Sequence, residues 1–392
     1  MSYILFDDAS RNRLKPLSYI RPVCDMRIGI LTIREKWELY LGQKTSTLTE
    51  QYLSEKYPIE FSDSMTLINS SICPTPSLVK AIDALGVNQV LTCEDYVVAM
   101  KKSKEDFISA TDDAEKIEGT KDFIKINNLW DIFAFNDQAL REDFALITKD
   151  RQSAKLSSSN RVLGEENIFV EEGAKVECAC LNANKSPIYI GKEAEIMEGS
   201  VIRGPFAMCE HSVVKLNAKI YGATTLGPHV KVGGELANVV IFGYSNKAHD
   251  GFIGNSVIGE WCNIGADTNA SNLKNTYEEV RLWDIEQNTF VPTGQVFCGT
   301  IFADHSKCGI NTMFNTGTVV GISSNIFGAG YQRNFIPSFA WGGTNGLKLY
   351  ELNKSIEVAE KMMLRRNIVM SQQDKDILTH VYNHTLKNKK LR

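Results

Sequence analysis

The sequence lacks the features that mark a membrane, secreted or metal-binding chain. In 392 residues there is no uninterrupted run of about 18 apolar residues, the length that a transmembrane helix needs, and no secretory signal opens the chain. The nine cysteines are an odd number and include no Cys-x-x-Cys pair, which argues against a disulfide framework and against a zinc site. We therefore expect free thiols, a cytoplasmic location and no membrane partner.

The chain also lacks a strong excess of charge of either sign. It has 43 Lys and Arg against 47 Asp and Glu, a formal net charge of −4, which argues against a nucleic acid as the main partner. Hydrophobic residues make up 43% and charged residues 23%, as is ordinary for a globular protein. The length is sufficient for two or three domains, each with its own core.

One stretch in the middle of the chain has a period of six. Every sixth residue is apolar, and four residues later the side chain is mostly small or β-branched; the apolar positions are Ile190, Ile196, Ile202, Met208, Val214, Ile220, Leu226 and Val232. This period fits neither an α-helix nor a half-exposed strand, but it is the hexapeptide pattern of a parallel β-helix. Stacked coils of such a helix would bury a continuous aliphatic column.

The same phase returns later in the chain. It covers 252–264 and 296–326, and an offset of two residues requires a loop or bulge near 233–250. A longer segment, about 270–294, leaves the repeat. Because insertions in a solenoid often carry its binding site, we expect the functional residues between 240 and 295.

The N-terminal part alternates between strand-like and helix-like segments. Residues 3–8 and 65–69 look like buried strands, and the spacing of apolar residues predicts helices over 27–43 and 77–85. This alternation favours an α/β domain.

The predicted segments divide the chain into three parts. We expect an α/β domain at 1–155, a β-helix at 156–343 and a helical tail at 344–392. The tail should contain helices near 351–369 and 372–387.

The first predicted strand ends in two carboxylates and is followed by a basic loop. Ligands of open α/β sheets bind at the carboxyl ends of strands, so the arginines within 11–22 could hold phosphate there. Asp7 and Asp8 could hold Mg²⁺ together with nucleotide phosphates. For both groups the alternative is a set of solvated charges.

The segment from Lys247 to Asn272 reads KAHDGFIGNSVIGEWCNIGADTNASN. It closely resembles the acetyltransferase core of the bifunctional GlmU-type sugar-1-phosphate family, which joins glucosamine-1-phosphate N-acetyltransferase to N-acetylglucosamine-1-phosphate uridylyltransferase. Members carry an N-terminal nucleotidyltransferase domain and a C-terminal left-handed parallel β-helix, and are usually trimeric. The resemblance covers the whole solenoid, about 160–330, and implies a homotrimer here.

The resemblance implies a set of site residues. His249 falls on the position of the general base, and the backbone N–H of Ala266 on that of the oxyanion donor. Asn263 and Asn272 would orient the sugar, and Lys247 would bind its phosphate. Acetyl-CoA would be the co-substrate. The alternatives are a solvated histidine, two turn or corner residues and a solvated lysine, while Lys219 and Lys231 are further candidates for the phosphate.

A second resemblance lies near the N-terminus. Arg13-Leu14-x-Pro16-Leu17-Ser18 followed by Arg21-Pro22 is similar to the signature loop R-L-x-P-L-T…P-K-P of sugar nucleotidyltransferases. It implies that Arg13 and Arg21 bind substrate phosphate, with UTP or another nucleoside triphosphate and Mg²⁺ as co-substrate and cofactor; it assigns no metal ligand. The usual Gly-rich segment is replaced by Phe6–Arg11. The pattern over 21–37 resembles a divergent, Bacteroidetes-type branch.

Together these patterns indicate a transferase that acts on a small sugar phosphate and a nucleotide. The leading hypothesis is a bifunctional enzyme that makes UDP-N-acetylglucosamine or a related nucleotide sugar by N-acetyl transfer and then nucleotidyl transfer. In one alternative only one half is active. In the other, the solenoid is a non-enzymatic scaffold that binds a sugar nucleotide.

Overall fold

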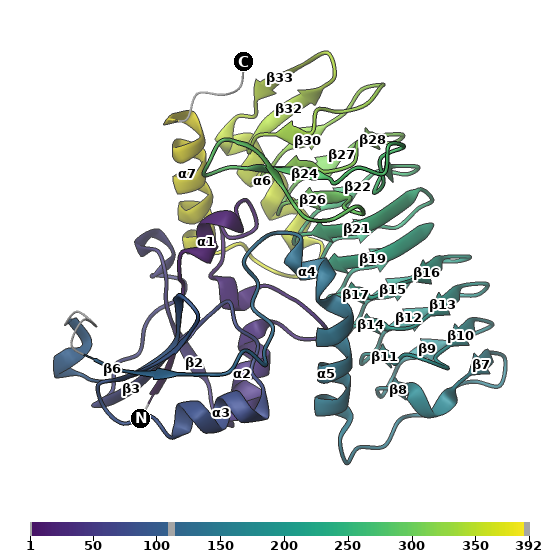
Figure 1. The fold of residues 1–392 in the computed structure, drawn as a ribbon. Coiled ribbons are helices and arrows are strands. Elements are labelled where there is room, and N and C mark those ends of the chain that lie inside the picture. Colours follow the sequence, from purple (N-terminus) through teal and green to yellow (C-terminus); the bar gives the residue numbers. More distant parts are fainter. Residues whose placement is uncertain (1, 109–113, 388–392) are drawn as a thin grey trace. The chain divides into compact units, whose positions relative to one another are not determined.

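The structure, a computed structural model, describes residues 2–108 and 114–387. Contacts divide the chain into two compact units (Figure 1). The first comprises residues up to Leu14, Ile20–Met26 and Leu31–Asn128, and the second Lys15–Tyr19, Arg27–Ile30 and all residues from Leu129. The predicted fold class is confirmed: an α/β unit, a parallel β-helix and C-terminal helices. The three domain limits stay a prediction. No helix in the described part of the chain has the length and apolar character to span a membrane.

The first unit is built on a six-stranded sheet with the order β2-β1-β3-β5-β4-β6. Strands β1, β2 and β3 are parallel, and β5 is antiparallel to both β3 and β4. Strand β1 lies between β2 and β3, so the chain reverses its direction of travel across the sheet at β1. The strands are β1 (Ser2–Phe6), β2 (Thr45–Leu48), β3 (Ser64–Asn69), β4 (Gln89–Cys93), β5 (Tyr96–Ser103) and β6 (Glu115–Glu118), and the helices are α1 (Ser10–Arg13), α2 (Ile33–Leu41) and α3 (Pro76–Asp83).

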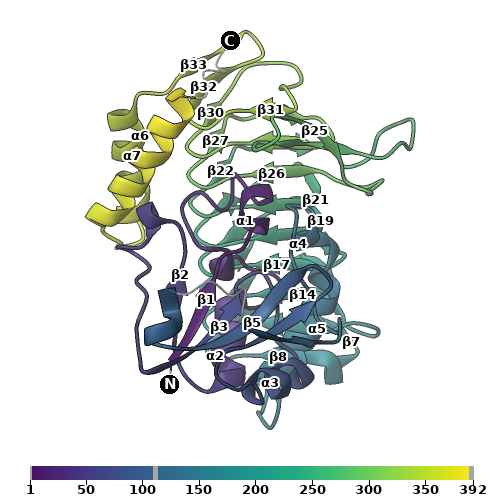
Figure 2. The same cartoon turned by 60° about the vertical axis from the view of Figure 1, so that its left-hand side comes forward.

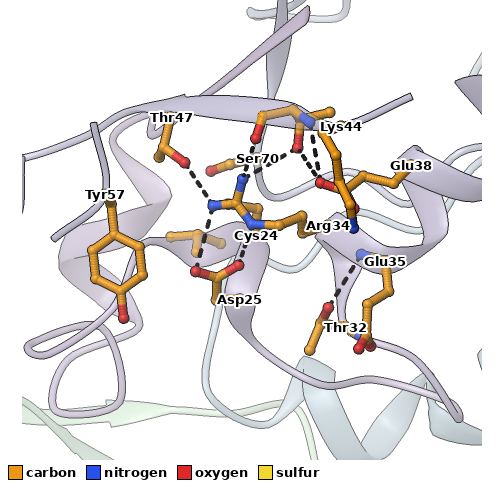
Figure 3. Close-up of polar contacts among 12 residues, drawn as sticks. Cys24, Asp25, Thr32, Arg34, Glu35, Glu38, Lys44, Thr47, Tyr57 and Ser70 are labelled. Carbon is orange, nitrogen blue, oxygen red and sulfur yellow. Dashed lines mark hydrogen bonds and ion pairs between the residues drawn. The ribbon is translucent and has the colours of Figure 1, made fainter. Parts of the chain in front are cut away.

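Helix α2 starts later than the predicted 27–43 because Thr32 ends the extended segment before it. The Thr32 side chain accepts a hydrogen bond from the Glu35 N–H, and the Glu35 carboxylate accepts one from the Thr32 N–H. The buried face of the helix carries Arg34, whose guanidinium donates to Asp25 at 2.5 Å and to the Thr47 hydroxyl at 2.6 Å (Figure 3). Arg34 therefore ties α2 to strand β2 and to the turn at Asp25.

The second unit is a β-helix whose coils stack in register (Figures 1 and 2). Its ten-stranded sheet consists of β9 (Lys175–Val176), β12 (Glu195–Ile196), β15 (Val213–Val214), β18 (Lys231–Val232), β20 (Asn246–Lys247), β22 (Asn263–Ile264), β27 (Lys307–Cys308), β30 (Asn325–Ile326), β32 (Ala340–Gly343) and β33 (Gly346–Leu349). The fifteen-stranded sheet consists of β7 (Arg161–Leu163), β8 (Ile168–Val170), β10 (Cys180–Asn182), β11 (Ile188–Ile190), β13 (Val201–Arg203), β14 (Phe206–Met208), β16 (Lys219–Tyr221), β17 (Thr224–Leu226), β19 (Glu235–Ile241), β21 (Phe252–Ile258), β23 (Asn269–Ala270), β26 (Thr300–Phe302), β28 (Met313–Phe314), β29 (Thr318–Val320) and β31 (Phe335–Ile336).

The predicted aliphatic column forms the core of this β-helix. All eight residues of the six-residue phase between Ile190 and Val232 are at most 1% exposed. The predicted change of register also occurs. Val213 pairs with Lys231, but Lys231 pairs with Asn246, so this coil is shorter than the one before it. Strand β19 accommodates the change by pairing with both β16 and β17.

Segments outside the coils brace the β-helix. The excursion predicted at 270–294 contains an antiparallel hairpin, β24 (Arg281–Asp284) and β25 (Thr289–Pro292). Helices α4 (Asp131–Ala134) and α5 (Asn136–Thr148) lie along the side of the β-helix, where the Asn136 amide donates to the Ala223 carbonyl at 2.8 Å. The C-terminal helices are α6 (Leu352–Leu364) and α7 (Gln372–Lys387). A capping box precedes α7: the Asp374 N–H donates to the Ser371 hydroxyl, and the Ser371 N–H donates to the Asp374 carboxylate.

The aliphatic column gives a direct test of the fold. Ile220 is 1% exposed and pairs with Ile202 and Leu236 of the neighbouring coils. In Ile220→Asp an unpaired carboxylate would lie in this column, so we expect a loss of about 3–5 kcal/mol in the free energy of unfolding. Denaturant titration measures it, with exposed Lys219→Asp as the control. Equal stabilities for the two variants would contradict the packing described here.

Candidate functional site

His249 and Ala266 line one cavity of about 670 Å³ on the surface of the β-helix. His249 lies in the turn between β20 and β21, and Ala266 lies in the turn after β22, on the next coil. The stacking of consecutive coils therefore brings together two predicted site residues that are separated in sequence. The cavity is open to solvent on one side, and its volume is in the range of small-molecule sites.

Both residues keep their functional groups available. His249 is exposed, and its imidazole hydrogen-bonds to none of the described residues. Ala266 accepts a hydrogen bond from the Asn311 N–H through its carbonyl, whereas its own N–H donates to no residue within 2–108 or 114–387. An imidazole that can accept a proton and a free backbone donor are the two groups that acyl transfer to an amine requires.

Charges of both signs line the same cavity. Lys215 contributes a cation, and Asp250 and Asp267 contribute carboxylates on either side of His249 and Ala266. Lys215 was not predicted; Lys219 and Lys231 were named instead, because the sequence phase does not show which lysine of a coil faces the turn at His249. The combination suits a ligand that carries both an ammonium and a phosphate group.

The structure places Lys247 beneath the turn at His249 and not among the residues that line the cavity. Its side chain is buried, and its ammonium donates to the carbonyl groups of His249 and Asp250. A side chain that binds phosphate must present its charge to solvent, but Lys247 occupies an inward position of the β-helix. It therefore acts within the fold beneath the His249 turn and does not line the cavity.

Asn263 and Asn272 lie outside the cavity. Asn263 is exposed on strand β22, and its N–H pairs with the Ser306 carbonyl. Asn272 follows β23 in the other sheet, where its amide donates to the Asn255 side chain at 2.8 Å. The two asparagines thus belong to different faces of the β-helix, and a single chain does not gather them around His249.

A basic cluster lies beside the cavity, made of Lys215, Lys231, Arg365 and Arg366. The Arg366 guanidinium donates to the His229 carbonyl at 3.3 Å. Burial lowers the pKa of Lys231, and repulsion by Arg366, Lys215 and Arg365 lowers it further. Burial and repulsion by Arg365 likewise lower the pKa of Arg366. Cations that repel one another in this way form a site for an anion, such as a phosphate group of coenzyme A.

The first unit carries a separate polar site at the carboxyl ends of β1 and β3. The Asp8 carboxylate accepts hydrogen bonds from Lys125 and Asn69, each at 2.9 Å. Burial alone would raise the pKa of Asp8, but attraction by Lys125 and hydrogen bonds from Ser10 and Asn69 outweigh it, so the pKa is lowered. Because β1 lies between β2 and β3, this is the topological switch point of the sheet, where ligands of open α/β sheets bind.

Asp7, in contrast, is a structural anchor. Its carboxylate accepts from the Arg11 guanidinium at 2.7 Å, the Ser70 hydroxyl at 2.7 Å and the Val23 N–H at 2.9 Å. With Asp7 occupied and Asp8 neutralised by Lys125, the pair does not make a Mg²⁺ site. Within the described residues, no three His, Cys, Asp or Glu side chains lie together as metal ligands. We therefore assign no step to Mg²⁺.

The two arginines of the signature loop differ in position. Arg13 is exposed, and its guanidinium donates to the carbonyl and side chain of Asn127 at 3.1 and 3.2 Å. Asn127 follows Lys125 by two residues in the sequence. Arg21 is 4% exposed, and its backbone carbonyl accepts from Arg11. Lys125 was not predicted from the sequence because no motif surrounds it. Only the folded structure shows that it lies beside Asp8, at the end of strand β1.

A second cavity in the β-helix unit, of about 400 Å³, contains none of the predicted site residues. It is lined by Trp283 of the hairpin, Phe335 of the last coils and His384 of α7. The Trp283 and Phe335 rings stack with centroids 4.8 Å apart. Of these two cavities, the first contains His249 and Ala266, and the second contains neither.

Residues 3–152 match the family model described as sugar nucleotidyl transferase. A bifunctional sugar-1-phosphate nucleotidylyltransferase/acetyltransferase of Sulfurisphaera tokodaii is 27% identical over 175 residues, which cover 44% of this chain and 41% of that protein. The match thus spans less than half the length of this relative.

Two solved structures are similar at a lower level. A UDP-N-acetylglucosamine acyltransferase from Arabidopsis is 16% identical, with a TM-score of 0.24, over 55% of this chain and 78% of that one. An N-acyltransferase from Bacillus cereus is 12% identical, with a TM-score of 0.23, over 49% and 89%. Likenesses this weak carry no inference about substrate.

These findings indicate the class of the protein first: residues 3–152 are similar to a family of transferases. The resemblance of the chain to the bifunctional sugar-1-phosphate nucleotidyltransferase and acetyltransferase family is confirmed as well.

Proposed function

We propose that this protein is a bifunctional sugar-1-phosphate enzyme that acetylates glucosamine-1-phosphate and couples the product to UTP, giving UDP-N-acetylglucosamine or a related nucleotide sugar. The observation that carries the proposal is the cavity shared by His249 and Ala266, which Lys215, Asp250 and Asp267 also line. An amino-sugar phosphate has an ammonium for the carboxylates and a phosphate for the lysine.

The acyl-transfer step uses groups already in place. The sugar amine attacks the thioester carbonyl of acetyl-CoA, and His249 takes the proton from the attacking nitrogen. The Ala266 N–H donates to the oxygen of the tetrahedral intermediate, which carries the developing negative charge. Collapse of the intermediate breaks the C–S bond, and the thiol of coenzyme A leaves with the proton. Lys231, Arg365 and Arg366 would hold the phosphates of coenzyme A.

The nucleotidyl-transfer step belongs to the first unit. The nucleoside triphosphate would bind at the carboxyl ends of β1 and β3, near Asp8, Lys125 and Arg13. Because no Gly-rich loop precedes the signature loop, the side-chain cations would replace backbone N–H groups in binding phosphate. Free thiols and the use of acetyl-CoA and UTP fit a reducing cytoplasm.

Product analysis with each component omitted in turn tests the proposal. Purified protein receives glucosamine-1-phosphate, acetyl-CoA, UTP and Mg²⁺, and products are identified by mass spectrometry. We expect N-acetylglucosamine-1-phosphate without UTP and the nucleotide sugar only in the complete mixture. Acetylation without nucleotidyl transfer would support an acyltransferase alone, and the reverse a nucleotidyltransferase with a structural solenoid. A protein that binds the nucleotide sugar without making either product would be a scaffold.

We expect the protein to be a homotrimer. The cavity at His249 is open, Asn263 and Asn272 lie outside it, and exposed Leu216 lines its rim. A neighbouring copy would supply the missing wall and its asparagine. Light scattering should give three times the chain mass at micromolar concentration, and Leu216→Glu should shift it towards the monomer with loss of acetyl transfer. A fully active monomer would contradict the shared site.

A further inference from the structure

Lys247 occupies a position of the β-helix that belongs to an aliphatic side chain. Val232 of the preceding coil pairs with Lys247, and Val232 in turn pairs with Val214, so the three residues stand in one inward column. Val214 and Val232 are fully buried, and Lys247 is 1% exposed. A charged side chain in such a column destabilises the fold unless hydrogen bonds to its neighbours replace those that it made with water.

The partners of Lys247 are the backbone of the turn that carries His249. Its ammonium donates to the His249 carbonyl and, at 2.9 Å, to the Asp250 carbonyl. Two consecutive carbonyl groups are thus directed inward at one point. This fixes the peptide planes on both sides of the Asp250 Cα and directs the turn. Since an apolar residue would fill the column equally well, the ammonium serves the turn and not the packing.

We propose that Lys247 is a positioning residue, whose buried ammonium holds the backbone of the His249 turn so that the imidazole faces the cavity. The inference rests on the proposed acyl transfer. It goes beyond that function by giving the reaction a residue that touches neither substrate nor coenzyme A.

The surroundings of Lys247 make this device sensitive to pH. Burial lowers the pKa of Lys247 to about 8; Asp250, Cys308 and Asp267 oppose this effect, and Lys219 adds to it. Above pH 8 the charge is lost and the bonds to the two carbonyls weaken, so acetyl transfer should decline on the alkaline side. Because the folded pKa lies below that of an unfolded lysine, the unfolded chain binds more protons between about pH 8 and 10.4, and stability should rise with pH there.

Lys307 provides a matched control. It is a second lysine on the ten-stranded sheet, its ammonium donates to the His305 carbonyl at 2.8 Å, and burial lowers its pKa to about 8. It does not line the cavity at His249. Lys307 is half-buried and pairs with Asn263 and Asn325, outside the inward column. Lys307→Met therefore controls for replacing a lysine of this sheet, bonded to a turn carbonyl, by an apolar chain of similar length.

The experiment compares these variants and Lys247→Arg in the full chain. For Lys247→Met we expect kcat of acetyl transfer to fall about 10- to 100-fold, as for a small displacement of a reacting group, with little change in KM. Its alkaline limb should disappear, and hydrogen exchange should accelerate at the amides of 248–251. Lys307→Met should keep the wild-type kcat and exchange in that turn. Lys247→Arg, which keeps the charge, should recover part of kcat.

Two results would overturn the inference. One is Lys247→Met with wild-type kcat and unchanged exchange in the turn. The other is an equal fall of kcat in Lys247→Met and Lys307→Met, which would mean a general loss of stability. If the wild-type protein transfers no acetyl group at all, the proposed function fails, and hydrogen exchange of the turn then decides the role of Lys247 by itself.

Discussion

His249→Ala is expected to lower kcat of acetyl transfer by about 10²–10⁴-fold, the usual effect of removing a positioned general base. The imidazole lies in the cavity that also contains the Ala266 N–H, and it makes no hydrogen bond within the described chain. Its removal should therefore cost little stability. Release of the coenzyme A thiol, followed with a thiol reagent, measures the rate, and thermal unfolding checks the fold.

The control for this substitution is His380→Ala, which removes an exposed histidine from helix α7. It should leave the rate unchanged. If His249→Ala were equally active, His249 would have no part in proton transfer, and Asp250, which lines the same cavity, would become the candidate base. Asp250→Asn would then distinguish the two.

Much of the β-helix could be predicted from the sequence because its contacts are local and periodic. Each coil repeats the same inward positions, so a column such as Ile190 to Val232 needs no knowledge of distant segments. The same reasoning located the change of register and the excursion near 270–294. His249 and Ala266 were implied by the resemblance of 247–272 to a known family, and the structure brings them together because they lie in turns of adjacent coils.

The inward position of Lys247 could not be predicted because of the shortened coil. A phase of six continued from Val232 does not reach residue 247, so no pattern in the sequence shows that this lysine points inward; only the pairing of Val232 with Lys247 shows it. Lys125 could not be predicted for a different reason. Its partner Asp8 is more than a hundred residues away, and a tertiary ion pair leaves no periodic trace.

Helix α2 shows how a tertiary contact shortens a predicted helix. The apolar spacing extends over 27–43, yet the Ile30 N–H donates to the Asp143 carboxylate and Gly29 adopts a positive φ of 73°. Contacts with α5 hold these residues in a bend, so the helix begins only at Ile33, after the Thr32 cap. Spacing alone does not report such a competing partner.

The last prediction concerns the first unit. Arg13→Ala should lower the rate of pyrophosphate release about 10- to 100-fold, the effect of losing a charge-assisted bond to phosphate. Arg13 suits this test better than Arg21, because Arg13 is exposed and donates to Asn127 on the protein surface, whereas alanine at buried Arg21 would also remove packing. Arg13→Lys should recover part of the rate, since lysine offers the charge without the planar fork.

Acetyl transfer should survive in Arg13→Ala, because the cavity at His249 is built from the β-helix alone. A coupled pyrophosphate assay beside the thiol-release assay, on the same preparation, measures both reactions. Arg141→Ala, which removes an exposed arginine from α5, is the control and should alter neither. If wild-type protein releases no pyrophosphate with UTP, dTTP or other nucleoside triphosphates, the first unit binds nucleotide without turnover or has a structural role. The pairing of Asp8 with Lys125 would then explain the inactivity, because it neutralises the carboxylate at the switch point of the sheet.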